Sequence, residues 1–173
     1  MSLSQDLLEQ ARILERKEPK RPKQASLRRA VSTAYYALFH HLIDLSSREI
    51  VRGSADWGLR EAEARSLNHA DMRKVCKSIA SRNPPAPMAS LLGQPLVLDS
   101  GLLAVSEAFV DLQQARHEAD YDLARRFTRD DVAALVDLAE DAFAGIDALK
   151  RRNTRQYRTF ILALAFHPSW SRA

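Results

Sequence analysis

The six residues from Arg116 to Tyr121 (RHEADY) combine side chains that can hold an anion with side chains that can move a proton. On an α-helix, at about 100° per residue, Asp120 lies about 40° from Arg116 and within reach of an ion pair. A guanidinium oriented by a carboxylate can present its other N–H groups as a fork to a phosphate. The structural alternative is an Arg–Asp pair that only braces the interior of a helix bundle or a dimer interface.

A second group of polar and aromatic side chains lies upstream, between Arg28 and His41. Arg29, Tyr36 and His40 share one side of a helix, because together with Thr33 they recur at steps of four, three and four. This stripe predicts a polar pocket facing Arg116 on another helix. In the alternative, the tyrosine rings fill the core and their hydroxyls reach the bundle edge. The candidate binding residues are Arg29, Tyr36, His40, Arg116, Asp120 and Tyr121.

Helical periodicity accounts for most of the chain, and the presence of only 5 glycines agrees with helix rather than sheet. We expect an all-α fold, a bundle of about five helices with an extra short C-terminal helix that Pro168 ends. Pro19 and Pro22 mark a linker after the first helix. The helices are expected over about 3–16, 25–47, 59–81 and 99–125, and from 128 onward, with a loop over 83–98.

Arg116 breaks the most regular apolar row in the sequence. From Leu102 the row advances through Phe109 and Leu112 at steps of three and four, which is the spacing of a bundle core, and it continues to Leu123. The next position after Leu112 is Arg116. The pattern therefore places a guanidinium where it reserves space for an apolar side chain.

Charge is unevenly distributed along the 173 residues, although the net charge is only +4. The 18 residues from Arg12 to Arg29 hold eight Lys or Arg and two Glu, and the chain from Lys150 to its end holds six Lys or Arg and no acid. The stretch from Asp99 to Asp147 holds twelve acids and four Arg. Basic ends suit a polyanion such as RNA, a second copy with its acidic middle, or simply solvated faces.

Composition divides the chain into an N-terminal helix and linker (1–24), a helical bundle (25–150) and a basic C-terminal helix and tail (151–173). The single cysteine, Cys76, excludes an internal disulfide and paired-cysteine zinc sites. No motif indicates a metal or another cofactor. Strictly apolar runs such as 160–166 fall far short of the roughly 20 residues that a membrane span needs. With no signal-peptide layout at the start, we expect a cytoplasmic protein without membrane contact.

Three motifs resemble those of prokaryotic HEPN-domain proteins. The run from Arg29 to His40 (RAVSTAYYALFH) is similar to their Ala-Tyr-Tyr-Ala-x-Phe-His signature. The segment 68–72 (NHADM) resembles the start of their next helix, and Arg116 to Tyr121 resembles their later Arg…Asp-Tyr motif. The resemblance covers roughly residues 25–148, and the order of the three motifs adds to it.

The resemblance implies a helical bundle, homodimerisation, and a role in toxin–antitoxin, phage-defence or RNA-processing systems. Many such proteins are metal-independent ribonucleases, and some are encoded beside a nucleotidyltransferase. Their catalytic Arg is followed by a His after about four to six residues. In this chain the corresponding positions after Arg116 hold Tyr121, Asp122 and Leu123.

Three functional hypotheses follow. The preferred one is binding of RNA or a nucleotide through a groove between the helices that carry Tyr36 and Arg116. A second is a metal-independent ribonuclease that uses His40 or His117 as an unusual proton carrier. A third is an interaction or dimerisation module without catalysis, which partners a nucleotidyltransferase.

Overall fold

The computed structural model describes residues 2–53, 55–152 and 154–170, and these residues form eight α-helices and no β-strand. The all-α prediction is confirmed, and eight helices replace the expected five with a C-terminal one. In the described chain no helix is both long enough and apolar enough to cross a lipid bilayer. The helices are α1 (Leu3–Arg16), α2 (Gln24–Ile50), α3 (Trp57–Ser66), α4 (His69–Ala80), α5 (Ala86–Leu92), α6 (Ser100–Tyr121), α7 (Arg129–Arg152) and α8 (Arg155–Trp170).

The additional helices arise where capping residues interrupt or start a helix. The segment 59–81, expected to be one helix, is divided between α3 and α4. Asn68 has extended backbone geometry and its side chain accepts the N–H of Asp71 at 3.0 Å, so it caps a new helix. The helix α5 lies in the segment 83–98, which was expected to be a loop. Pro87 occupies its first turn, where the missing N–H of a proline has no partner to lose.

Two helix ends also differ from the sequence-based expectation. The helix α6 ends at Tyr121 instead of near Arg125, because the Asp122 carboxylate accepts the N–H groups of Ala124 and Arg125 and turns the chain. Leu123, expected in the buried row, is consequently 90% exposed. The helix α8 continues two residues past Pro168, since a proline disturbs the turn before it and not the residues after it.

Internal contacts divide the chain into two compact units. The first comprises the residues up to His41 and the segment Ala108–Ala144, and the second comprises Leu42–Glu107 and the residues from Gly145 onward. The boundaries fall inside α2, α6 and α7. The three segments predicted from composition remain a sequence-based division, and residues 171–173 of the predicted tail lie outside the described residues.

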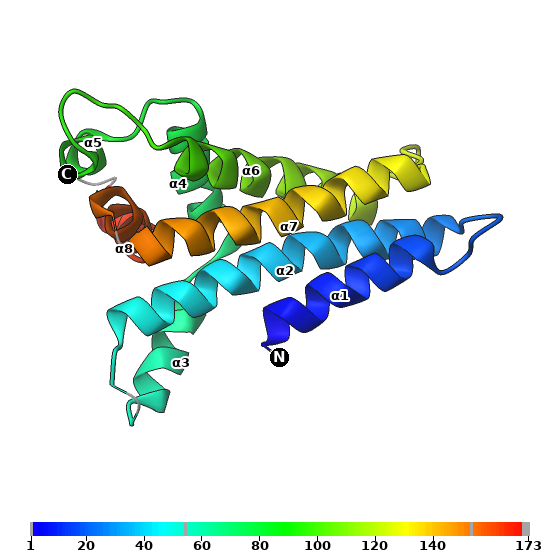
Figure 1. The fold of residues 1–173 in the computed structure, drawn as a ribbon, viewed down its shortest axis with the longest axis horizontal. Coiled ribbons are helices and arrows are strands. Elements are labelled where there is room, and N and C mark those ends of the chain that lie inside the picture. Colours follow the sequence, from blue (N-terminus) through cyan, green and yellow to red (C-terminus); the bar gives the residue numbers. More distant parts are fainter. Residues whose placement is uncertain (1, 54, 153, 171–173) are drawn as a thin grey trace. The chain divides into compact units, whose positions relative to one another are not determined.

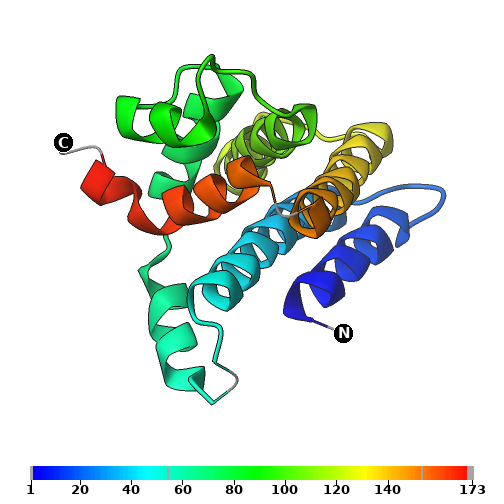
Figure 2. The same ribbon diagram turned by 60° about the vertical axis from the view of Figure 1, so that its left-hand side comes forward.

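The first unit is a bundle built from α1 and parts of α2, α6 and α7. Figures 1 and 2 show α1 alongside the first part of α2. Arg12 of α1 forms ion pairs with Asp137 and Glu140 of α7, at 2.5 and 2.9 Å. The ring of Tyr35 on α2 packs edge-on against Phe109 of α6, with 5.6 Å between ring centres. The fully buried residues of this unit include Ala11, Ala30, Val31, Ala34, Leu38, Leu112, Val132, Val136 and Ala139.

In the second unit, α8 packs against α4 and α5. The side chain of Gln156 links the start of α8 to the loop between α5 and α6, because it donates to the Val97 carbonyl at 2.7 Å and accepts the Asp99 N–H at 2.8 Å. Thr159 donates to the carbonyl of Leu91 at the end of α5. The core of this unit includes Met72, Val75, Ile79, Met88, Tyr157 and Phe160.

Within the first unit, Arg28 of α2 holds the end of α6. Its guanidinium donates to the carbonyl oxygens of Ala119 and Asp122, both at 2.8 Å, and also to that of Arg125. The last carbonyl groups of a helix have no partner within the helix, and the helix dipole favours a cation beside them. Arg28 therefore fixes the position of α6 relative to α2 at the level of Tyr121.

Replacing Arg28 with glutamine should lower the free energy of unfolding by about 2 kcal/mol, because several carbonyl groups lose a charged donor. The matched control is Arg29→Gln, since Arg29 is exposed and, within the described part of the chain, its guanidinium has no partner. That control should change the free energy by less than about 0.5 kcal/mol. Urea denaturation followed by circular dichroism measures both, and equal effects of the two substitutions would contradict the role of Arg28.

Candidate functional site

Arg116 lies at the edge of the buried face of α6. Its side chain is 22% exposed, while Leu112 and Ala119 on the same helix are 0% and 4% exposed. The sequence pattern placed Arg116 among the core residues, and the structure corrects this. A guanidinium can stay charged at the edge because water still reaches part of it.

Asp120 holds Arg116 as the four-residue spacing predicted. The Nε atom of Arg116 lies 2.8 Å from Oδ2 of Asp120, forming an ion pair on one helix face. The other carboxylate oxygen of Asp120 accepts a hydrogen bond from the hydroxyl of Ser32 on α2, at 2.5 Å. Ser32 is 2% exposed, so its donor has no access to bulk water. Ser32 thus positions the carboxylate that positions Arg116.

Two tyrosine rings flank the guanidinium. Nη2 of Arg116 donates to the hydroxyl of Tyr36 on α2 at 2.8 Å. The guanidinium carbon lies 5.5 Å from the centre of the Tyr36 ring and 5.8 Å from that of Tyr121, distances at which a cation is attracted to a ring face. Tyr121 is 65% exposed. We call Arg116, Asp120, Ser32, Tyr36 and Tyr121 the Arg116 cluster.

The cluster keeps Arg116 positively charged. Partial desolvation acts to lower the pKa of the guanidinium, but the hydrogen bond with Tyr36 and the nearby Asp120 outweigh it and raise the pKa above its usual value. Within the described residues, the remaining terminal nitrogen, Nη1, donates to no protein group. The site therefore holds a permanent cation with one free edge.

The two candidate proton carriers each lie one aromatic ring away from Arg116. His40 is half-buried, and its ring lies 6.4 Å from that of Tyr36 and 5.4 Å from that of Phe39. Burial lowers the pKa of His40, so its imidazole is neutral at pH 7. His117 is exposed and its ring lies 5.0 Å from that of Tyr121.

Of the six binding residues predicted from the sequence, the structure brings Tyr36, Asp120 and Tyr121 to Arg116, with His40 beside Tyr36. Arg29 is exposed and has no described contact with the cluster. Ser32 and Arg28 were not predicted from the sequence. Their partners lie 88 or more residues away, so no local spacing could reveal them.

Two other groups were weighed from the sequence. Among the residues that the structure describes, no three His, Cys, Asp or Glu side chains gather closely enough to hold a metal ion. Cys76 is fully buried on α4, and burial raises the pKa of its thiol far above the usual range. Lys74 and Lys77, its neighbours in the sequence, therefore do not activate it as a nucleophile.

The pKa of His40 predicts acid-sensitive stability. The unfolded state binds a proton at His40 below about pH 6.5, whereas the folded state resists that proton to a lower pH, so the free energy of unfolding falls as the pH drops below about 6.5. His167, whose pKa burial also lowers, adds to this loss. In a His40→Gln variant the loss between pH 7.5 and 5.5 should be smaller. Urea titrations across this range, and at pH 8 as a baseline, measure the free energy of unfolding. If His40→Gln loses as much of it as the wild type does, His40 is not a buried neutral imidazole.

No protein-family model, curated protein or solved structure matches this chain.

Proposed function

We propose that this protein binds RNA, or a nucleotide that presents the same phosphate and base, through the Arg116 cluster. The observation that carries the proposal is a guanidinium held in place on two sides with its third side open. Nη2 donates to Tyr36, Nε lies in an ion pair with Asp120 without making a hydrogen bond, and Nη1 is left for an outside acceptor. A preorganised cation of this kind suits the oxygens of a phosphate group.

Tyr121 supports a nucleotide over a simple anion. A tyrosine that is 65% exposed at the end of α6, with its ring near both Arg116 and His117, offers a flat face beside the cation. Bases of single-stranded nucleic acid stack on such faces, and the stacking does not depend strongly on sequence. Phosphate on Arg116 and base on Tyr121 would engage one nucleotide at two points.

A purely structural Arg–Asp pair explains the cluster less well. Such a pair braces a protein best when both charges are sealed from water and all their hydrogen bonds are made within the protein. Here the side chains of Arg116 and Asp120 are 22% and 30% exposed, and Arg28 already supplies the bracing contact between α2 and α6.

The resemblance to HEPN-domain proteins supports a setting for this binding. We place the protein in a toxin–antitoxin or defence system, as a homodimer that works with a nucleotidyltransferase. A ribonuclease activity is the second candidate, and the observation that favours it is the neutral His40 beside Tyr36, because a neutral imidazole can accept a proton from a ribose hydroxyl.

Substitution of Arg116 should weaken RNA binding far more than loss of an equivalent charge elsewhere. For Arg116→Gln we expect the dissociation constant for a labelled single-stranded RNA of about 10–20 nucleotides to rise at least tenfold, because a charged phosphate contact is lost. The slope of the logarithm of the association constant against the logarithm of the salt concentration should become less steep, its magnitude decreasing by about 0.7. Fluorescence anisotropy at several salt concentrations measures both quantities.

The matched control for this experiment is Arg126→Gln. Arg126 is an exposed arginine of the same unit with no partner among the described residues, and its loss should change the affinity by less than about threefold. Equal losses for both variants would show that binding follows general charge and not the cluster. RNA cleavage in EDTA that His40→Gln or His117→Gln abolishes would instead establish the ribonuclease. If Arg116→Gln changes only the oligomeric state in light scattering, the interaction module is correct.

Tyr121 provides an independent test of base stacking. Tyr121→Ala should weaken binding of single-stranded RNA roughly tenfold, since a stacked base contributes about 1–3 kcal/mol, while binding of an RNA duplex of the same length should hardly change. Tyr121→Phe should retain the wild-type affinity because it keeps the ring. A matching loss in both variants would assign the effect to the hydroxyl and contradict stacking.

A further inference from the structure

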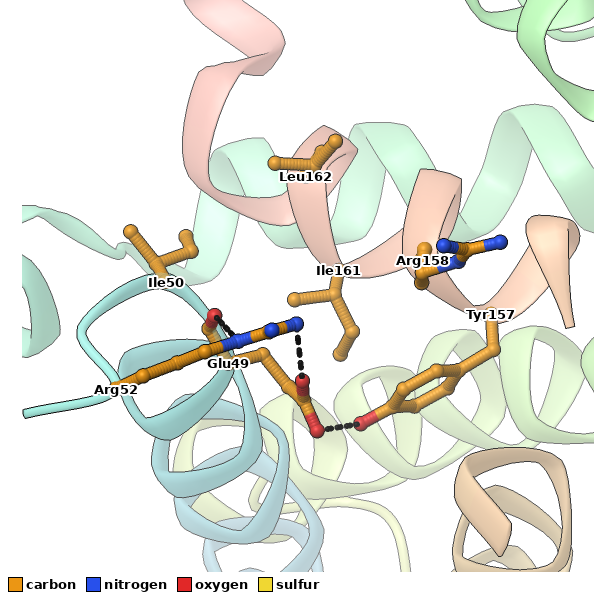
Figure 3. Close-up of a pocket in the computed structure, with 7 residues that line it drawn as sticks. All are labelled: Glu49, Ile50, Arg52, Tyr157, Arg158, Ile161 and Leu162. Atoms are coloured by element: carbon orange, nitrogen blue, oxygen red, sulfur yellow. Dashed lines mark hydrogen bonds and ion pairs between the residues drawn. The ribbon is translucent and has the colours of Figure 1, made fainter. Parts of the chain in front are cut away.

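The second unit contains a hollow of about 280 Å³ between the end of α2 and the first half of α8. Figure 3 shows the side chains that line it: Glu49 and Ile50 belong to α2, Arg52 follows that helix, and α8 contributes the remainder. The hollow is slightly smaller than the roughly 300–1,000 Å³ of pockets for drug-sized ligands, so it suits a smaller molecule. It shares no residue with the Arg116 cluster.

The inner wall of the hollow is apolar. Ile161 is 2% exposed and Tyr157 is 1% exposed, while Leu162 is 41% exposed at the opening. Ile50 is half-buried on the opposite side. An alkyl group placed here would leave water for contact with these side chains, which is the main source of affinity for small apolar groups.

The single carboxylate at the hollow is already surrounded by donors. The hydroxyl of Tyr157 donates to Oε1 of Glu49 at 3.4 Å, and Lys150 lies 4.0 Å from the same oxygen. Arg52 lies 3.7 Å from Oε2. Burial, together with the negative charge of Glu49, raises the pKa of Tyr157, so its hydroxyl remains a donor. Figure 3 shows Arg52 and Tyr157 reaching this carboxylate from different sides.

Positive charge therefore exceeds negative charge at the opening. Arg158 lies exposed on α8, and its guanidinium makes no hydrogen bond or ion pair with any described residue. With Lys150 and Arg52 it gives three cations against the two carboxylates of Glu49 and Asp147, both of which act on Tyr157. An apolar wall with an uncompensated guanidinium at its edge matches a molecule that is apolar at one end and anionic at the other.

We propose that this hollow binds a small amphipathic anion, a short alkyl chain that ends in a carboxylate or a phosphate ester. The alkyl chain lies against Ile161, Ile50 and Leu162, and the anionic group pairs with Arg158. Arg52 is the second cation available to the head group, because its contact with Glu49 is long at 3.7 Å. The site is separate from the proposed RNA binding and does not depend on it.

Isothermal titration of the full chain with butyrate, hexanoate and octanoate tests the alkyl contact. The dissociation constant should fall about fourfold for each added methylene until the hollow is filled. Octyl phosphate in the same titration identifies the preferred head group. Octan-1-ol has eight carbons and no charge. It should bind at least tenfold more weakly than the tighter-binding of octanoate and octyl phosphate. Equal binding of octan-1-ol, or no binding of either octanoate or octyl phosphate, would overturn the proposal.

Matched variants locate the site. Arg158→Gln should weaken binding of the tighter-binding of octanoate and octyl phosphate about tenfold. Leu162→Asp should weaken this binding further, because it places a negative charge at the opening. Arg155→Gln, one turn earlier on α8, should have no effect because Arg155 does not line the hollow. Arg82→Gln is a second control, since Arg82 lines another hollow of about 280 Å³ beside Leu96 and Leu103. A loss of binding confined to Arg82→Gln, or binding only to anionic phospholipid vesicles, would refute the assignment.

Discussion

The contact between the Arg28 guanidinium and the carbonyl oxygens at the end of α6 is the constraint on which the Arg116 cluster depends. A helix end needs donors for its last carbonyl groups, and here they come from a neighbouring helix instead of from water. Because Arg28 fixes the end of α6 against α2, the Ser32 hydroxyl meets Asp120 and the Tyr36 hydroxyl meets Arg116. That contact adds a polar constraint on the register of the two faces to the packing of Tyr35 against Phe109.

The two arginines illustrate how protein surroundings assign different tasks to the same side chain. Arg28 donates hydrogen bonds to carbonyl oxygens of the same chain and therefore stabilises the fold. Arg116 donates from one terminal nitrogen to the neutral hydroxyl of Tyr36 and forms an ion pair with the partly exposed carboxylate of Asp120. Its guanidinium therefore stays cationic and keeps one free edge. The contacts of Arg28 close a helix end, whereas those of Arg116 leave N–H groups that an anion could accept. Sequence position alone does not separate them, since both follow helical patterns.

Some local contacts were predictable, because both partners lie within one turn of a helix. The capping pairs Ser2–Gln5 and Thr128–Asp131 and the ion pair between Arg116 and Asp120 depend on spacings of three or four residues. The boundary at Asn68 was missed, because an asparagine within a helical pattern has the same local signature whether it continues the helix or caps a new one. The end of α6 was missed for a similar reason, as Asp122 forms a turn that competes with the helix.

From the sequence by itself one could determine the all-helical class, the apolar row of α6 from Leu102 to Leu112, and the pairing of Arg116 with Asp120, because each depends on periodicity along one helix. Only the tertiary structure decided that Arg116 lies at the edge of the core, that Arg28 and not Arg29 contacts α6, and that Ser32 holds Asp120. It alone also brought Glu49 and Tyr157 together beside a hollow. These contacts join residues 80 or more positions apart, and their geometry is set by how whole helices pack, which no short stretch of sequence encodes.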